Sequence, residues 1–164
     1  MQRRFARRRS PIHGHGVFAL RALAADEHLM QYRGKRVPAD EVKQRFDDTG
    51  ASGHTFLFSL NAQYYIDGND GGNLARWINH CCAPNCEAVI HVDINGDEAR
   101  DRVLIHALRP IAAGEELSFD YAIELSCEPD EAMRRAWACH CGAAQCRGTM
   151  LQSLGNTFEA KTAP

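Results

Sequence analysis

Cysteine gives the clearest chemical pattern in this chain. Cys139, Cys141 and Cys146 form a C-x-C-x4-C cluster near the C-terminus, and residues 79–86 (NHCCAPNC) contain three more cysteines. The three clustered thiols lack a fourth ligand of their own for a tetrahedral zinc ion, and the mid-chain segment can supply it. The spacing therefore predicts a structural zinc site that fixes the tail of the chain onto the body of the domain.

The identity of the fourth ligand depends on how the mid-chain segment runs. In an extended segment alternate side chains face opposite ways, so only one of Cys81 and Cys82 is expected to point at the metal. Cys86, and His140 inside the tail cluster, also compete for the site. The spacing alone leaves these alternatives open.

The composition is that of a single globular domain. The chain has 164 residues, of which 45% are hydrophobic and 24% are charged, so it can bury a substantial core. No apolar run approaches the length of a membrane span, and none follows the arginine-rich start, so neither a membrane span nor a secretory signal is expected. Seven cysteines are an odd number, and three of them lie in one short cluster. This predicts metal ligation in a reducing, cytoplasmic compartment and no disulfide framework.

Positive charge is concentrated at the N-terminus. The first nine residues contain five arginines and no acidic residue: Arg3, Arg4, Arg7, Arg8 and Arg9. The formal net charge is −2, and the residues that follow hold 14 basic against 21 acidic side chains, a charge of −7. The acidic residues after position 9 favour a cationic partner, for example a lysine-rich peptide. Binding of nucleic acid is not expected, except through the N-terminal arginines. The run itself is interpreted as a solvated tail or as an edge strand guarded by charge.

Hydrophobic periodicity predicts a β-rich α+β domain with many short strands and two modest helices. Asn95-Gly96 is a strong hairpin signal between two of the strands. The expected strands lie at residues 28–32, 55–60, 63–66, 87–92 and 102–107, the helices at 38–46 and 129–137, and loops at 47–53 and 68–72.

Four short motifs follow one another along the chain: GHGVFA at residues 14–19, QYRG at 31–34, GNLARWINH at 72–80 and GEELSFDY at 114–121. In type and order they resemble the SET-domain protein lysine methyltransferases, and the cysteine tail is similar to the post-SET zinc segment of that family. The resemblance implies a SET-domain (β-clip-like) fold with a threaded C-terminal segment. It divides the chain into a basic N-terminal extension (1–9), a SET domain (10–125) and a post-SET zinc segment and tail (126–164). Without a pre-SET cysteine cluster, this arrangement is similar to small bacterial SET proteins.

The resemblance implies a protein lysine N-methyltransferase that uses S-adenosylmethionine. A dry aromatic channel would hold the neutral lysine amine, since burial disfavours the ammonium form. Its candidate lining is Tyr32, Phe56, Phe119 and Tyr121, with Tyr121 at the position of the catalytic tyrosine. Phe119 occupies a size-gate position, where phenylalanine predicts di- or trimethylation. Phe56 stands where many members carry a second channel tyrosine.

The cofactor contacts implied by the resemblance come from four parts of the chain. They are the backbone of His15, Gly16, Val17 and Phe18, the central residues Arg76, Trp77, Asn79 and His80, then Tyr121, and Leu151 in the tail. Glycine at position 16 would let the backbone approach a ligand closely.

In the family pattern the fourth residue of Asn-His-Ser-Cys ligates zinc, which implies Cys82, Cys139, Cys141 and Cys146 as the ligands, with Cys81 in place of the serine. The expected partner is a lysine-containing protein, either a histone tail or a bacterial protein, and a eukaryotic chain would act in the nucleus. The alternative is a catalytically weak, zinc-stapled module that binds a basic peptide without modifying it.

Overall fold

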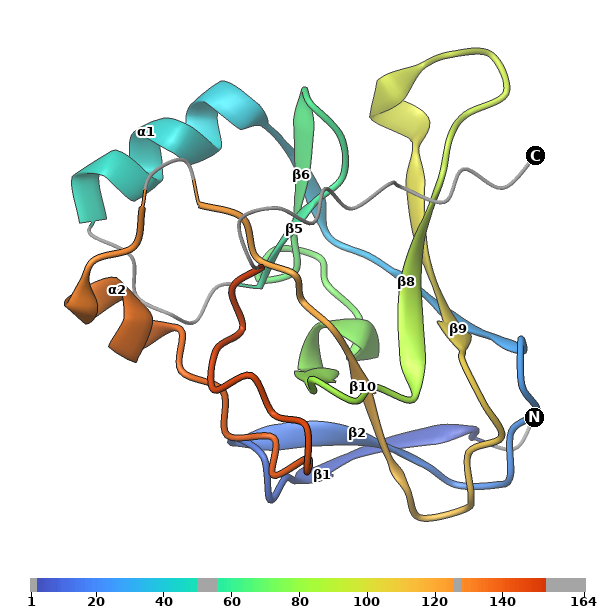
Figure 1. The fold of residues 1–164 in the computed structure, drawn as a ribbon. Coiled ribbons are helices and arrows are strands. Elements are labelled where there is room, and N and C mark those ends of the chain that lie inside the picture. Colours follow the sequence, from blue (N-terminus) through green and yellow to red (C-terminus); the bar gives the residue numbers. More distant parts are fainter. Residues whose placement is uncertain (1–2, 50–55, 126–127, 153–164) are drawn as a thin grey trace.

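Three small β-sheets surround the centre of the molecule (Figure 1). The structure, a computed structural model, describes residues 3–49, 56–125 and 128–152. Within these residues strands outnumber helices, which confirms the predicted β-rich α+β class. The two α-helices lie together on one side of the molecule, away from the long β8–β9 hairpin.

The largest sheet has the strand order β1-β2-β10-β7. Its strands are β1 (Phe5–Arg9), β2 (His15–Ala19), β7 (Asn79–His80) and β10 (Glu116–Phe119). β1 and β2 form an antiparallel pair, so the arginine run is an edge strand and not a solvated tail. β2 also pairs antiparallel with β10, and β10 pairs parallel with β7. This last pair brings two motifs that are far apart in the sequence into direct contact.

The other two sheets are antiparallel and have the orders β3-β9-β8 and β4-β6-β5. Their strands are β3 (His28–Tyr32), β4 (Lys35–Pro38), β5 (Leu57–Ser59), β6 (Tyr64–Asp67), β8 (Cys86–His91) and β9 (Arg102–Ala107). The predicted strands at 28–32, 63–66, 87–92 and 102–107 are confirmed within a residue or two. The β8–β9 turn passes through Gly96, whose φ of 75° favours glycine, and continues into the 3-10 helix η2 (Glu98–Arg100).

Two α-helices and one further 3-10 helix complete the chain: α1 (Ala39–Thr49), α2 (Glu131–Ala136) and η1 (Leu74–Trp77). α1 continues past the predicted end at residue 46. The prediction of a loop is therefore wrong for residues 47–49, which are helical. No glycine or proline interrupts the helix before Gly50, and the rest of that loop lies outside the described residues. α2 is shorter than predicted because Asp130 caps its start, accepting a hydrogen bond from Met133 N at 2.7 Å.

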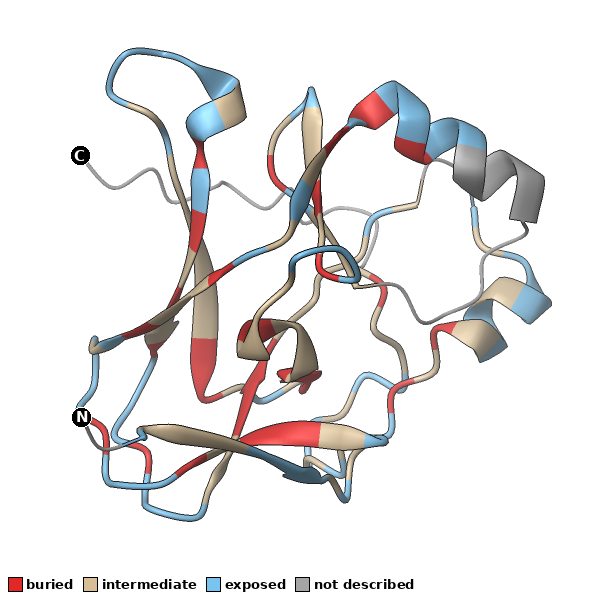
Figure 2. Ribbon diagram, turned by 180° about the vertical axis from the view of Figure 1, so that it is seen from behind, coloured by how far each residue is buried: buried red, intermediate tan, exposed pale blue. Residues whose placement is uncertain are grey.

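The hydrophobic core lies between the three sheets. Val17, Ile78, Ile105, Ile111 and Leu117 are at most 1% exposed, and they come from β2, the η1–β7 junction, β9, the β9–β10 connection and β10. Figure 2 shows these buried segments converging on the centre, while most of α2 and the β8–β9 turn is exposed. Among the described helices, none is both long and apolar enough to cross a membrane.

Candidate active site and thiol cluster

β7 is the strand that organises the site. Asn79 pairs with Ser118 and His80 with Phe119 in the parallel β7–β10 ladder, and Cys81 N donates to Phe119 O at 3.2 Å. Asn79 and His80 are 7% and 3% exposed, so two polar side chains are buried at the centre of the fold. Buried polar groups of this kind require internal hydrogen-bond partners.

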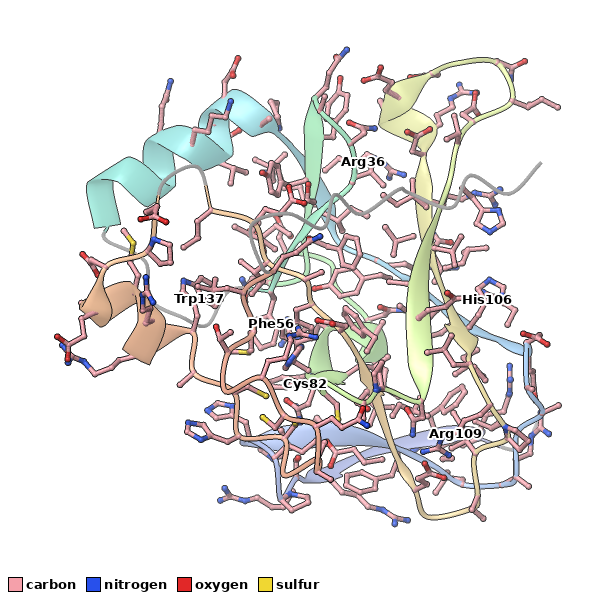
Figure 3. All side chains as sticks on the ribbon, in the orientation of Figure 1. Arg36, Phe56, Cys82, His106, Arg109 and Trp137 are labelled. Carbon is pink, nitrogen blue, oxygen red and sulfur yellow. The ribbon has the colours of Figure 1, made fainter. Side chains whose placement is uncertain are left out.

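A small hollow, partly open to solvent, lies beside β7 and η1. Five of its lining residues were predicted to contact the cofactor or the substrate amine from the sequence, and Phe56, predicted for the channel, is the sixth. Figure 3 draws the side chains of this region and labels Phe56 and Cys82. The full lining is His13, Gly14, His15, Phe56, Arg76, Trp77, Asn79 and Tyr121.

The amide orientation of Asn79 is fixed by four acceptors around its nitrogen. Nδ2 lies 3.0 Å from Ser10 Oγ and 2.8 Å from Glu116 Oε1, and it lies 3.2 and 3.0 Å from the carbonyl oxygens of His13 and His15. An amide nitrogen only donates, so this environment sets which way the side chain is flipped. The amide oxygen is therefore turned away from this network and remains available as an acceptor.

Glu116 explains why residue 16 is glycine. A Cβ on Gly16 would lie 2.0 Å from Glu116 Oε1, so the missing side chain makes room for the carboxylate that holds Asn79. Ser10 Oγ also donates to Glu116 Oε2 at 2.9 Å. Of the four predicted backbone contacts at 15–18, only His15 lines the hollow; Val17 is fully buried in the core, with no surface left for a ligand.

Tyr121 joins the hollow to a cluster of aromatic rings. Its hydroxyl donates to Ile78 O at 2.7 Å, and its ring centre lies 5.0 Å from that of Phe119. Burial, with smaller contributions from Tyr32 and Glu116, raises the pKa of Tyr121. The phenol is therefore neutral at physiological pH, and its oxygen lone pairs remain able to accept a hydrogen bond.

The aromatic cluster differs in one member from the predicted channel. Tyr32, Phe58 and Phe119 pack in sequence, with ring centres 5.3 Å apart for the first pair and 6.2 Å for the second. Phe56 instead packs edge-on against Trp77, at 5.1 Å. Phe58, which the sequence did not identify, thus belongs to the aromatic cluster, whereas Phe56 lines the hollow. Its backbone oxygen accepts from the Tyr32 hydroxyl at 2.8 Å.

Cations cover the aromatic wall of the hollow. The guanidinium carbons of Arg7 and Arg76 lie 5.0 and 4.8 Å from the centre of the Trp77 ring, and Arg76 also lies 5.1 Å from Phe56. Arg76 Nη1 donates to Gly68 O at 2.7 Å, which anchors the glycine loop. Such cation–π contacts stabilise the rings and place positive charge beside them.

Four thiols converge in a second site beside Tyr121. The Sγ atoms of Cys82, Cys139, Cys141 and Cys146 all lie within 4.8 Å of one another, and Cys82 is 3.7 Å from Cys139 and 4.0 Å from Cys146. Sulfurs bound tetrahedrally to zinc at about 2.3 Å are roughly 3.8 Å apart, so the geometry fits a zinc ion. Neither Cys81 nor Cys86, both buried, belongs to this group.

The protonation of the thiols also fits a metal site. Burial raises the pKa of Cys82 and Cys139. Burial opposes ionisation of Cys141 too, but hydrogen bonds from backbone N–H groups and neighbouring thiols outweigh it and lower its pKa to about 6. Four thiolates at these separations repel one another, so complete ionisation requires a bound cation.

His80 connects the thiol cluster to Tyr121, the candidate catalytic residue. Tyr121 N donates to His80 Nδ1 at 3.1 Å, and His80 Nε2 lies 3.4 Å from Cys82 Sγ. A nitrogen that accepts carries no proton, so the neutral ring has its hydrogen on Nε2, directed at sulfur. Burial lowers the pKa of His80, while Asp120 opposes and Arg147 reinforces the shift. The 3.4 Å approach of Nδ1 to Asp120 is therefore not an ion pair.

A bidentate ion pair closes the tail over this region. Arg147 Nη1 and Nη2 donate to the Asp120 carboxylate at 2.6 and 2.9 Å. The backbone N of Arg147 also donates to Cys82 Sγ at 3.4 Å, so one tail residue contacts both the cluster and the end of β10. Leu151, predicted to pack on the cofactor, is 7% exposed and bridges to Ile123, and it does not line the hollow.

The family of the chain follows from its sequence match. Residues 14–122 match the family profile described as SET domain. The chain belongs to the SET domain family. The matched region of this SET domain runs from the turn before β2 to just beyond β10 and contains every residue that lines the hollow except His13, whereas the three tail cysteines lie C-terminal to it.

Relatives extend the match into the tail. The chain is 39% identical over 142 residues to "Histone-lysine N-methyltransferase, H3 lysine-4 specific" of Saccharomyces cerevisiae, and 38% identical over 143 residues to the Candida albicans protein of the same name. It is 37% identical over 145 residues to human "Histone-lysine N-methyltransferase SETD1A". These matches cover 85–87% of this chain but only 8–13% of the relatives, so the chain spans a small part of their length.

Several residues of the site were not identified from the sequence. Ser10 acts through contacts distant in sequence and Arg147 through one side-chain ion pair, so no local pattern indicates them. Glu116 lies within the motif at residues 114–121, but its contact with Asn79 is distant in sequence and gave it no role there. Asn85 is 3% exposed and bridges two segments: Nδ2 donates to Glu116 O at 2.8 Å, and Oδ1 accepts from Ser118 N at 2.8 Å. Its position within residues 79–86 was the one available signal.

Proposed function

We propose that this chain is an S-adenosylmethionine-dependent protein lysine N-methyltransferase. The observation that carries the proposal is the position of Tyr121, which lines the hollow and also contacts Phe119 in the aromatic cluster. A single hydroxyl at the junction of two sites can align a group held in one with a group held in the other. The names of the relatives support the same reaction.

The hollow fits the polar and aromatic parts of the cofactor. Asn79 presents an amide acceptor whose orientation is fixed, which suits the ammonium group of S-adenosylmethionine, and Trp77 with Phe56 offers an apolar wall. When bound, the cofactor would supply a sulfonium methyl group, and its sulfur would leave as a neutral thioether while the lysine nitrogen forms its bond to the methyl carbon.

The protein's own residues would prepare the lysine. A free lysine amine has a pKa near 10.4, so at physiological pH only roughly one in a thousand is neutral. The aromatic cluster of Tyr32, Phe58, Phe119 and Tyr121 excludes water and so favours the neutral amine. The neutral Tyr121 phenol, whose proton is donated to Ile78 O, would accept a hydrogen bond from the amine and orient it, without acting as a base.

The proposed substrate is a lysine in a histone tail. The fungal relatives carry names specifying lysine 4 of histone H3, and the acidic body of this chain complements a lysine-rich peptide. Phenylalanine at position 119, without a hydroxyl to hold water, supports di- or trimethylation as the product.

We also propose that Cys82, Cys139, Cys141 and Cys146 bind one structural zinc ion. The sulfur separations and the His80 hydrogen bond to Cys82 support this assignment. The ion would hold the tail against the end of β10, next to the Asp120–Arg147 ion pair. Zinc removal should therefore loosen the tail and weaken substrate binding together.

Cofactor binding tests the proposal most simply. Calorimetry with S-adenosylmethionine should show binding by the wild-type protein and at least tenfold weaker binding by Asn79→Ala. Asn69→Ala, on an exposed residue of the glycine loop, is the matched control and should bind normally. A wild-type protein that binds a histone peptide but no cofactor would contradict the proposal and would favour the alternative, a zinc-stapled peptide-binding module.

A further inference from the structure

The edge strand β1 carries an unusual set of unpaired charges. Arg3, two residues before the strand, and Arg7, Arg8 and Arg9 within it are all exposed. None of the four forms an ion pair with a carboxylate among the residues that the structure describes, whereas neighbouring Arg4 pairs with Glu27. These four guanidinium groups lie within seven residues and make a local positive surface on a chain whose residues after position 9 carry a charge of −7.

The fold holds these arginines in place. Arg7 lies 5.0 Å from the Trp77 ring centre and Arg8 lies 5.8 Å from the Phe18 ring centre, so aromatic rings support their side chains from below. The five-residue pairing of β1 with β2 fixes the backbone beneath them. The charge is thus ordered on a strand and not spread over a free tail, which lowers the entropic cost of binding a partner.

We infer that this arginine surface of Arg3, Arg7, Arg8 and Arg9 binds the phosphate backbone of a nucleic acid duplex. Guanidinium groups form bidentate hydrogen bonds to phosphate oxygens, and a polyanion gains affinity from each cation that it meets through release of its counterions. The acidic remainder of the chain would repel such a partner, so binding should be confined to this strand.

A membrane surface fits the observations less well. Proteins that bind at a lipid interface insert apolar side chains between the headgroups. Here the nearby rings of Phe5, Phe18 and Trp77 are partly buried and lie beneath guanidinium groups, which leaves little apolar surface to insert. Leu20, which is 38% exposed, is the one large exposed apolar side chain next to this strand pair within the described residues.

The position of the surface also matters for the site. Trp77 lies under Arg7 and lines the hollow, so a duplex bound on β1 would lie beside the hollow. If the proposed histone substrate is correct, DNA bound there would raise the local concentration of a tail attached to the same particle. The binding itself does not depend on that function, and it is tested without any transfer reaction.

The test is fluorescence anisotropy with a labelled 24-base-pair DNA duplex of mixed sequence, titrated with the full chain at several salt concentrations. If four arginines each neutralise one phosphate, log K should fall with log salt with a slope of about −3.6, which is a loss of roughly 150-fold between 50 and 200 mM salt. The triple variant Arg7→Gln/Arg8→Gln/Arg9→Gln should retain a slope near −0.9 and lose only about 3- to 4-fold over the same range.

A control with the same change in charge separates this surface from net charge. Arg100→Gln/Arg134→Gln/Arg135→Gln removes three exposed arginines from η2 and α2, and it should keep the wild-type slope. Arg3→Gln/Arg9→Gln spares both ring contacts, so it should fold normally and reduce the slope by about 1.8. Melting temperatures verify that each variant is folded.

Three results would overturn the inference. One is the absence of duplex binding by the wild-type protein at 50 mM salt. Another is an equal loss of binding in the β1 triple variant and the control. The third is binding to phosphatidylserine vesicles without binding to the duplex, which would assign the surface to membranes.

Discussion

The ion pair between Asp120 and Arg147 should stabilise the tail on the domain by a measurable coupling energy. Both side chains are about one-third exposed, at 30% and 33%, and they share two hydrogen bonds of 2.6 and 2.9 Å. Fully exposed pairs contribute about 0.2–1 kcal/mol, and hydrogen bonds to charged groups contribute about 1.5–3 kcal/mol when shielded. For a bidentate pair of intermediate exposure we expect a coupling energy of about 1–1.5 kcal/mol.

A double-mutant cycle measures this energy. The zinc-loaded wild-type protein, Arg147→Gln, Asp120→Asn and the double variant are unfolded in urea, and the coupling energy is the non-additive part of the free energy of unfolding. The matched control is the Glu131–Arg135 pair of α2, which spans i to i+4 and is 83% and 69% exposed. Its cycle should give only about 0.3–0.5 kcal/mol.

The comparison between the two cycles decides the outcome. Zinc content, measured for every variant, should stay at one ion per chain, because neither residue supplies a thiol. A coupling energy for Asp120–Arg147 no larger than that of the control pair would show that this contact does not hold the tail on the domain.

Three further predictions concern single positions. Phe119→Tyr should shift the products toward fewer methyl groups, measured by mass spectrometry of a histone peptide; an unchanged product distribution would remove the size-gate role. Cys146→Ser should reduce bound zinc, measured by mass spectrometry of metals, while Cys86→Ser, outside the cluster, should leave it unchanged; loss in both variants would contradict the ligand set. Gly16→Ala should displace the Glu116 carboxylate, release Asn79 and weaken S-adenosylmethionine binding at least tenfold, because the new Cβ would lie 2.0 Å from Oε1; normal binding by calorimetry would show that this network is not needed.

Local sequence signals predicted most of the fold. Alternating hydrophobicity placed β3 and β9, and Asn95-Gly96 placed the turn between β8 and β9. Residues without a periodic pattern were harder to place. β7 has only two residues and exists because it pairs with β10, a contact that no local pattern encodes. The arginine run forms β1 since its backbone pairs with β2, although its side chains resemble those of a solvated tail.

Residues that would contact a ligand or a metal directly were predictable from the sequence, whereas residues that position other side chains were not. The three tail cysteines were identified by type and spacing, Tyr121 and Cys82 were assigned from the family resemblance, and the structure brings the four sulfurs together. Glycine at position 16 remains predicted to let the backbone approach a ligand, and its small size also accommodates Glu116, a contact that the sequence did not indicate. Phe58 and Phe56 are two residues apart on one segment, and only the packing against Phe119 and Trp77 tells their environments apart.

The most direct test of the proposed activity is methyl transfer with Tyr121→Phe as the matched variant. Purified protein is incubated with labelled S-adenosylmethionine and core histones, and modified lysines are identified by mass spectrometry. We expect methyl-lysine with the wild-type protein and at least about 100-fold slower transfer by Tyr121→Phe, which is the usual effect of removing one group that orients or stabilises the transition state. Cofactor binding by the variant should be retained. Transfer at the wild-type rate by Tyr121→Phe would contradict the central role of this hydroxyl.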